Sequence, residues 1–318
     1  MSKSLEKHAA VIALWSALKW LIMLGAYGYL AYVLLTFEKY DELFLSIRQA
    51  SFFQLSWLLV VLALLPLNLF FESAKWKVII SKTETTSLSK SFRSVLAGFS
   101  TGFITPNRTG EFAGRILFME KKHRKTGIIY SVINSLTQNL VIIMCGLPAA
   151  VFFFVEIKNG IQPDLEMYFL VILTALTSLL TLYFKLPRLV KSKHIQRYIS
   201  FTNDLSLYTK SDLLNILLIS LARFLIFSFQ FYAILQFFGV DLAPTEAFIA
   251  IPANYLFVTI TPSLAFSEAA IRSSYAVFFM SEFSTQTAGI AFAGVSLWLI
   301  NFGIPMLAGA IMLVNKKD

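Results

Sequence analysis

The stretch Phe52–Phe71 reads FFQLSWLLVVLALLPLNLFF and contains no charged side chain. A helix needs about 20 predominantly apolar residues to cross the hydrocarbon core of a bilayer, and this stretch meets that length. It therefore predicts a transmembrane helix and places the protein among integral membrane proteins.

Further segments are long and apolar enough to span a membrane: residues 18–37, 127–154, 166–184, 212–238 and 286–314. Of all 318 residues, 57% are hydrophobic and 14% are charged, whereas an ordinary soluble domain carries about 25% charged residues. This composition excludes a large soluble protein. The sequence predicts an all-α integral membrane protein with about six transmembrane helices, forming a single transmembrane domain over residues 1–318.

The net charge of +9 follows from membrane topology and does not indicate a nucleic-acid partner. Lys and Arg number five in 72–94, six in 106–126 and six in 185–211, but two in 37–50, one in 156–165 and none in 239–246. Positive residues gather in cytoplasmic loops. The first three loops and both basic termini are therefore predicted to be cytoplasmic, in a multi-pass protein of the cell membrane.

Two apolar segments do not read as simple spans. Residues 95–105 are too few, and residues 247–281 are interrupted by Pro262 and two charged side chains. The first segment joins two cytoplasmic loops, so it must enter and leave the membrane from the inside. The second starts from an external loop and precedes a span that runs inward, so it must enter and leave from the outside. Both are predicted to be re-entrant helical elements.

The chain also carries a repeated motif. Ile104-Thr105-Pro106 precedes Glu111 and Arg115, as Ile260-Thr261-Pro262 precedes Glu268 and Arg272. Motifs this short can match by chance, but the order of segments gives separate support. Two halves, approximately residues 10–155 and 160–315, each read as span, span, re-entrant element, span, beginning on opposite sides of the membrane. This pattern predicts an inverted-topology repeat, which is common in secondary transporters.

The residues around the first motif favour an anion site. Pro106 favours the first turn of a new helix, with Thr105 as its cap. A half-helix that begins there would direct free N–H groups toward a phosphate or carboxylate. Arg108 adds a guanidinium that can bind the same anion through two hydrogen bonds.

Two charged pairs accompany this site. Glu111 and Arg115 are spaced i,i+4, as are Glu268 and Arg272, so each pair can meet on one helix face. Each pair either binds substrate or only stabilises its own helix. Charged residues within the membrane are functional candidates by default.

Other polar residues in apolar segments have two interpretations each. Arg223 lies near the middle of its predicted span, and Asn134 and Gln138 lie in another; they either line a substrate path or bond between helices. Lys75 and Trp76 follow the second span, where they either contact a lipid head group or anchor the helix at the interface.

Motifs of known enzymes are missing. The three histidines, His8, His123 and His194, lack the spacing of metal ligands. The lone Cys145 cannot form an intrachain disulfide. No Gly-rich phosphate loop or nucleophile elbow occurs. We therefore expect no catalytic residue, metal or cofactor, although a membrane enzyme with scattered polar residues is not excluded.

At these motifs the chain resembles the transmembrane, flippase-like domain of lysylphosphatidylglycerol synthases. The similar residues are Lys75-Trp76, then Pro106-Asn107-Arg108-Thr109-Gly110-Glu111, then Arg115, and the resemblance covers about residues 15–310. Ser263-Leu264-Ala265-Phe266 replaces a Gly-rich stretch of the family, and Asn134, Ser135 and Gln138 replace charged residues. The soluble aminoacyl-transferase domain has no counterpart before residue 318, so the resemblance implies the lipid-translocating part alone.

The sequence and the resemblance together predict a stand-alone lipid flippase whose partners are membrane lipids with an anionic head group. A second hypothesis is a non-transporting protein that presents lipid to a separate synthase or glycosyltransferase, and a third is a membrane-embedded lipid transferase. The predicted substrate-binding residues are Lys75, Trp76, Arg108, Glu111, Arg115, Asn134, Gln138, Arg223, Glu268 and Arg272.

Overall fold

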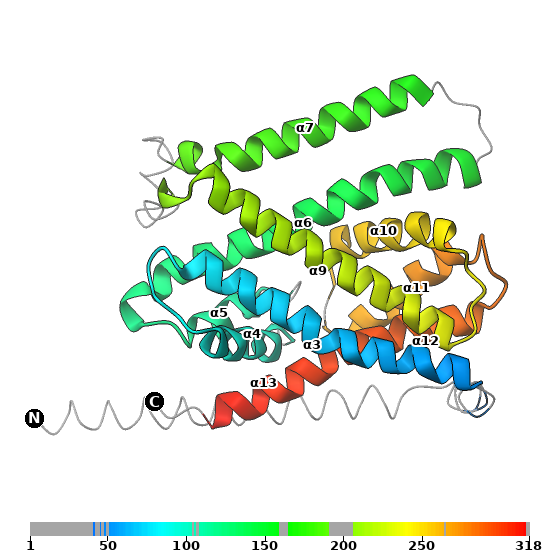
Figure 1. The fold of residues 1–318 in the computed structure, drawn as a ribbon, viewed down its shortest axis with the longest axis horizontal. Helices are drawn as coiled ribbons and strands as arrows, with labels where there is room; N and C mark the ends of the chain where they lie inside the picture. The colour runs from blue at the N-terminus through cyan, green and yellow to red at the C-terminus, as the bar shows by residue number, and fades with distance from the viewer. Residues whose placement is uncertain are drawn as a thin grey trace, which may run out of the picture.

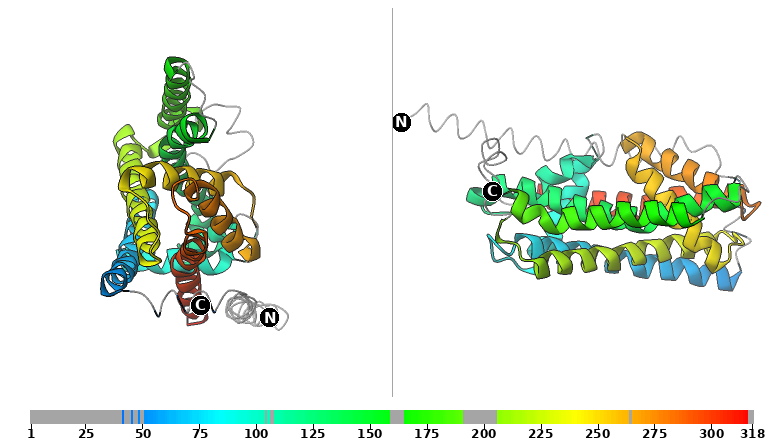
Figure 2. Two further views of the ribbon diagram at one scale, coloured as in Figure 1. Left: turned by 90° about the vertical axis from the view of Figure 1, so that its right-hand side faces the viewer. Right: turned by 90° about the horizontal axis from the view of Figure 1, so that it is seen from above.

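The fold was analysed in a computed structural model that describes residues 51–315 apart from 104, 106–107, 159–164, 191–205 and 264, together with Asp41, Leu45 and Arg48. Across these described residues every regular element is a helix (Figures 1 and 2). The predicted span 18–37 and both chain termini lie outside the described residues.

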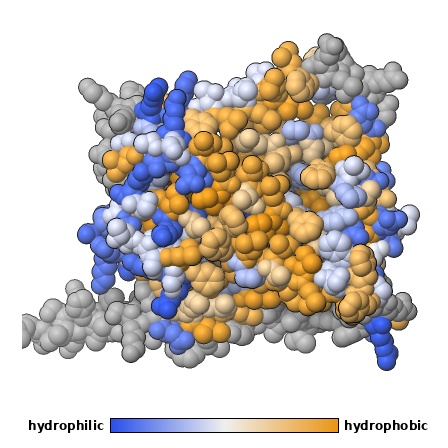
Figure 3. All heavy atoms as spheres, in the orientation of Figure 1, coloured by the Kyte–Doolittle hydropathy of each residue, from blue (hydrophilic) through white to orange (hydrophobic). Residues whose placement is uncertain are grey.

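Five helical segments of the described chain are long and apolar enough to cross a membrane. Three of them are the single helices α3 (Phe52–Ile80), α7 (Leu165–Val190) and α9 (Lys210–Phe237). The fourth is α6 (Arg124–Phe152), which follows the 3-10 turn η2 (Lys121–His123) and continues into the π-helix η3 (Phe153–Lys158). The fifth consists of α12 (Thr287–Trp298), η5 (Leu299–Gly303) and α13 (Ile304–Val314). These segments match five of the six predicted spans. Figure 3 shows an apolar band between two polar margins, as expected for a protein that spans a bilayer.

The repeated motif lies at a break between two helices in both places. In the first, α4 (Leu88–Gly102) ends before the motif and α5 (Gly110–Ile116) carries its Glu and Arg. In the second, α10 (Pro244–Ile260) ends at the first residue of the motif and α11 (Ala265–Met280) carries its Glu and Arg. The two helix pairs lie toward opposite ends of the molecule, α4–α5 at the left of Figure 1 and α10–α11 at the right. Each break therefore brings charged side chains inward from a different end.

The last span contains a π-helical segment, η5, that joins α12 to α13. Single π-helical turns widen a helix locally and occur often at functional sites. This segment carries Asn301 and Phe302, and both line the cavity described below.

Helix α13 approaches α4 closely, and small residues make this approach feasible. A Cβ atom added at Gly309 would lie 1.9 Å from the carbonyl oxygen of Leu96. Beside it, the Ser100 hydroxyl donates a hydrogen bond to the Met306 carbonyl over 2.5 Å. This contact holds the break between α4 and α5 against the last span.

Replacing Gly309 by alanine should separate α4 from α13 and lower stability by about 1–3 kcal/mol, the usual cost of overpacking a filled core. Thermal unfolding of the purified protein in detergent measures this loss. The matched control is Ile311→Ala in the same helix. The Ile311 side chain is exposed, so its truncation leaves no cavity in the packed core. An unchanged melting temperature for Gly309→Ala would show that the helices separate without cost.

Candidate functional site: a charge network and a central cavity

Glu72 is a buried carboxylate that meets three cations, one from its own helix and two from other helices. It extends from α3 and is 1% exposed. Its Oε1 lies 2.6 Å from Arg115 Nη2, and its Oε2 lies 2.9 Å from Arg223 Nη1 and 3.1 Å from Lys75 Nζ. The amide of Asn134 donates a further hydrogen bond to Oε1 over 2.8 Å. One carboxylate thus joins α3, α5, α6 and α9.

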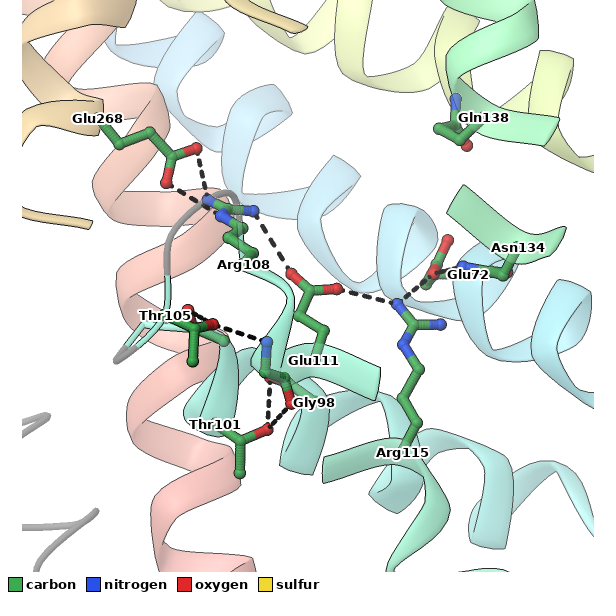
Figure 4. A network of polar contacts seen from close by, with 12 residues as sticks. Glu72, Gly98, Thr101, Thr105, Arg108, Glu111, Arg115, Asn134, Gln138 and Glu268 are labelled. Carbon is green, nitrogen blue, oxygen red and sulfur yellow. Dashed lines mark hydrogen bonds and ion pairs between the residues drawn. The ribbon is translucent and has the colours of Figure 1, made fainter. Parts of the chain in front are cut away.

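The charges continue from Glu72 toward the second motif (Figure 4). Arg115 Nη2 also lies 3.2 Å from Glu111 Oε2, and Glu111 Oε1 lies 3.8 Å from Arg108 Nη1. Arg108 then binds Glu268 through a hydrogen bond of 2.9 Å from Nε to Oε2 and an ion-pair contact of 2.9 Å from Nη2 to Oε1. This pairing connects the loop before α5 to α11.

The series ends at Arg272. Its Nη2 and Nε both donate to Glu268 Oε1, over 2.8 and 3.1 Å. Arg272 is the most exposed arginine of the series, with 27% of its side chain accessible. We call the connected residues the charge network: Glu72, Lys75, Arg108, Glu111, Arg115, Arg223, Glu268 and Arg272.

The charge network is not neutral. Its five cationic side chains face three carboxylates, so two positive charges remain uncompensated among the described residues. Each carboxylate already serves at least two cations. Charges within a membrane are expensive unless they are paired. A bound anion would therefore stabilise this arrangement.

The local structure before α5 aims Arg108 at this network. Arg108 has a φ of +56°, a left-handed conformation that is uncommon for a residue with a side chain. The Thr105 hydroxyl accepts a hydrogen bond from the Gly110 N–H over 2.6 Å, and Thr101 donates to the Gly110 carbonyl over 2.7 Å. The Arg108 guanidinium also stacks on the Phe302 ring, 3.8 Å from its centroid. Such local strain persists where surrounding contacts hold it, often at functional sites.

This geometry corrects the predicted half-helix. Helix α5 begins at Gly110 rather than at Pro106, because the hydroxyl groups of Thr105 and Thr101 bind the backbone of Gly110. The N-cap residue is Thr109 and not Thr105, although the Thr105 hydroxyl accepts a hydrogen bond from the Gly110 N–H. Helix α5 has seven residues and its first N–H is already bonded. Anion attraction therefore rests on guanidinium groups and not on a helix terminus.

A polar cavity of about 240 Å³ lies beside the charge network. Three arginines line it: Arg108, Arg223 and Arg272. No aspartate or glutamate is among the lining residues that the structure describes. The other lining side chains are mostly carboxamides (Asn68, Gln138, Asn139, Asn254 and Asn301) and aromatic rings (Phe99, Phe227, Phe231, Tyr255, Trp298 and Phe302). We call this space the central cavity.

A relay of carboxamides holds Arg223 at the cavity wall. Arg223 Nε donates to Asn68 Oδ1 over 2.9 Å, and Asn68 donates to Asn301 over 3.2 Å. Asn301 donates to Gln230 over 2.7 Å, and Gln230 donates to the Val61 carbonyl over 2.8 Å. Because each amide is fixed by the next one, the guanidinium has one preferred orientation.

Most predicted site residues fall into one region. Four of them line the central cavity: Arg108, Gln138, Arg223 and Arg272. Four others do not line it but bind members of the charge network: Glu111, Arg115, Asn134 and Glu268. The predicted pairing of Glu111 with Arg115 and of Glu268 with Arg272 is confirmed. Neither pair is confined to its own helix, because Arg115 also binds Glu72 and Glu268 also binds Arg108.

The interpretation of Lys75 and Trp76 as an interfacial anchor is wrong. Both side chains are fully buried. Lys75 binds Glu72 and also donates to Gln138 Oε1 over 3.2 Å. Trp76 lies with its ring 5.5 Å from the Arg115 guanidinium carbon. An anchor would extend toward the lipid interface, whereas Lys75 is part of the charge network and Trp76 packs against Arg115. Neither residue is among those that line the central cavity described above.

Several residues of this region were missed from the sequence: Glu72, Asn68, Asn254 and Asn301. A usable signal was present. Asn68, Asn254 and Asn301 are each a lone polar residue in an apolar segment, and polar groups within a membrane usually face a partner or a cavity. Glu72 also lies three residues before Lys75, a spacing at which opposite charges can meet on a helix.

Comparison with known proteins supports the resemblance noted from the motifs. Residues 8–309 match the family described as the lysylphosphatidylglycerol synthase TM region. No curated protein matches significantly. No solved structure does either. The match covers nearly the whole chain, so this membrane protein belongs to the family of the lysylphosphatidylglycerol synthase TM region, which is associated with lipid handling.

Proposed function

We propose that the protein is a flippase that moves an anionic lipid across the cell membrane, without acting as an enzyme. The observation that carries this proposal is the central cavity, which is lined by three arginines and no described carboxylate. Guanidinium groups bind phosphate oxygens through paired, charge-assisted hydrogen bonds. Membership of a lipid-handling family makes a membrane lipid the natural source of that phosphate.

The proposal includes an inverted-topology repeat. Helices α4–α5 would form a re-entrant element that enters from the cytoplasm, and α10–α11 one that enters from outside. The opposite placement of the two helix pairs supports this topology (Figure 1). Substrate sites of such transporters lie where the two repeats meet, and Arg108 and Glu268 make such a contact here.

The pairing of Arg108 with Glu268 also suggests how binding of a lipid head group could start a movement between the two halves. A lipid phosphate in the central cavity competes with Glu268 for the Arg108 guanidinium. If the phosphate displaces Glu268, the bidentate contact between the two motifs is lost, and α11 can move relative to α5. Glu268 keeps Arg272 as a partner during this exchange. Substrate binding would thus loosen one contact between the halves without leaving a carboxylate unpaired.

The flippase proposal is tested by reconstituting the purified protein into phosphatidylcholine vesicles that contain a trace of acyl-labelled phosphatidylglycerol. A membrane-impermeant quencher then reports how much label reaches the outer leaflet. We expect protein-dependent movement, with strong loss in Arg223→Ala and little change in Glu120→Gln, an exposed residue. Binding without movement would select the lipid-presenting protein instead, and a new lipid product without any partner would select the transferase.

The predicted orientation has its own test. In a Cys145→Ser background, a cysteine at Lys122 should react only with reagents that reach the cytoplasm, because the loop 106–126 is basic. A cysteine at Asp241 should react from outside, because the loop 239–246 has no basic residue. Both positions are exposed. Labelling of both cysteines from the same side would contradict the predicted topology.

A further inference from the structure

We infer that the lipid head group is a phosphodiester of a hydroxyl-rich alcohol or sugar and that it carries no amine. This inference rests on the proposed function and names the substrate class of the same site. Three features of the central cavity lead to it: its arginines, its carboxamides and the absence of a carboxylate among its described lining residues.

The arginines select a phosphate. Arg108, Arg223 and Arg272 come from the loop before α5, from α9 and from α11, and they line one cavity. The two uncompensated positive charges of the charge network favour a ligand that brings negative charge. At about 240 Å³ the cavity is smaller than typical pockets for drug-sized ligands, about 300–1,000 Å³. It suits a head group and leaves the acyl chains in the bilayer.

The carboxamides select hydroxyl groups. An amide side chain offers both donors and acceptors, which matches a hydroxyl that donates one hydrogen bond and accepts others. Asn254 lines the cavity and is 2% exposed, and its Oδ1 has no hydrogen-bond donor among the described residues. A buried acceptor of this kind is costly unless it is satisfied. A hydroxyl group on the ligand would satisfy it.

Because no carboxylate is among the described lining residues, the cavity disfavours a head group that carries an amine. An ammonium group in the cavity would face the guanidinium groups of Arg108, Arg223 and Arg272, and the described part of the lining holds no acidic residue to pair with it. The carboxylates that pair with these arginines are already shared, since Glu268 binds Arg108 and Arg272, and Glu72 binds three cations. An aminoacylated head group therefore meets like charges instead of a partner.

The test compares four lipids with identical labelled acyl chains for binding to the purified full-length protein in detergent. Phosphatidylglycerol carries a phosphate and hydroxyls, phosphatidylmethanol carries the phosphate alone, lysylphosphatidylglycerol adds amines, and phosphatidylcholine adds a quaternary ammonium. We expect phosphatidylglycerol to bind tightest. Phosphatidylmethanol should bind roughly two- to tenfold more weakly for each hydrogen bond lost, and the two cationic head groups should bind more weakly still.

Asn254 variants sharpen the comparison. Asn254→Leu should narrow the affinity ratio between phosphatidylglycerol and phosphatidylmethanol toward one, because the hydroxyl acceptor is gone. Asn254→Asp adds a carboxylate of the same shape and should raise the affinity for lysylphosphatidylglycerol relative to phosphatidylglycerol. Size-exclusion profiles and melting temperatures report whether each variant folds. If a variant does not fold, the comparison of the four lipids on the wild-type protein still tests the inferred substrate class.

The outcomes separate the two proposals. Equal affinity for phosphatidylglycerol and lysylphosphatidylglycerol, or equal affinity for phosphatidylglycerol and phosphatidylmethanol, would overturn the inferred substrate class and leave the anionic-lipid proposal in place. Failure to bind any of the four lipids would overturn both. Tight binding of phosphatidylglycerol, with the expected order of the other three, would support both.

Discussion

Replacing Glu72 by glutamine should destabilise the protein by about 3–5 kcal/mol, the usual cost of removing one partner from a buried ion pair. The mutation leaves Arg115, Lys75 and Arg223 around a neutral amide, and the first two of these cations are buried. The measurements are the melting temperature in detergent and the yield of monodisperse protein. We expect both to fall steeply.

Two further variants test whether a loss of stability in Glu72→Gln comes from the buried charges. Glu120→Gln breaks an exposed ion pair with Lys122 and should change the melting temperature little, because water screens such pairs. Adding Lys75→Met to Glu72→Gln removes one of the stranded cations and should recover part of the lost stability. A Glu72→Gln protein as stable as the wild type would show that the charge network does not depend on this carboxylate.

Replacing Arg108 by alanine should weaken binding of an anionic lipid by about ten- to a hundredfold. This range corresponds to the roughly 1.5–3 kcal/mol of a hydrogen bond to a charged group. Arg108→Lys should be intermediate, because lysine keeps the charge but loses the planar fork and the stacking on Phe302. Equilibrium binding of acyl-labelled phosphatidylglycerol to the three purified proteins measures the effect.

A matched variant on the opposite side of the pair separates binding from packing. Glu268→Gln frees Arg108 from its bidentate partner, so binding of the anionic lipid should strengthen while movement across the membrane slows. Arg108→Ala should weaken both. Equal lipid affinity in the wild type, Arg108→Lys and Arg108→Ala would remove Arg108 from the binding site.

The spans of this protein could be predicted from the sequence because a run of about 20 apolar residues is a local property. The pairing of Glu111 with Arg115 was also local, since both lie on one turn of a helix. The start of α5 was predicted four residues early. Its position is set by the hydroxyl groups of Thr105 and Thr101, whose bonds to Gly110 no composition rule describes.

Contacts between distant segments were beyond the reach of sequence reasoning. Arg108 was predicted to meet an anion, but 160 positions separate it from Glu268, its partner in the structure. Glu72 was overlooked because it stands at the basic end of a span, where a charge is ordinary. Only the packing of α3 against α5, α6 and α9 shows that this carboxylate is buried among cations.

The unequal count of cations and carboxylates has an electrical consequence. With five cations facing three carboxylates, the unloaded site carries positive charge, and an inside-negative membrane potential pulls it toward the cytoplasm. Moving one elementary charge across the whole membrane changes its electrostatic free energy by about 2.3 kcal/mol per 100 mV of potential. In the proposed flippase, a bound lipid phosphate would cancel part of that charge. Loaded and unloaded forms of the carrier would therefore respond differently to voltage, and the membrane potential itself would favour one direction of lipid movement.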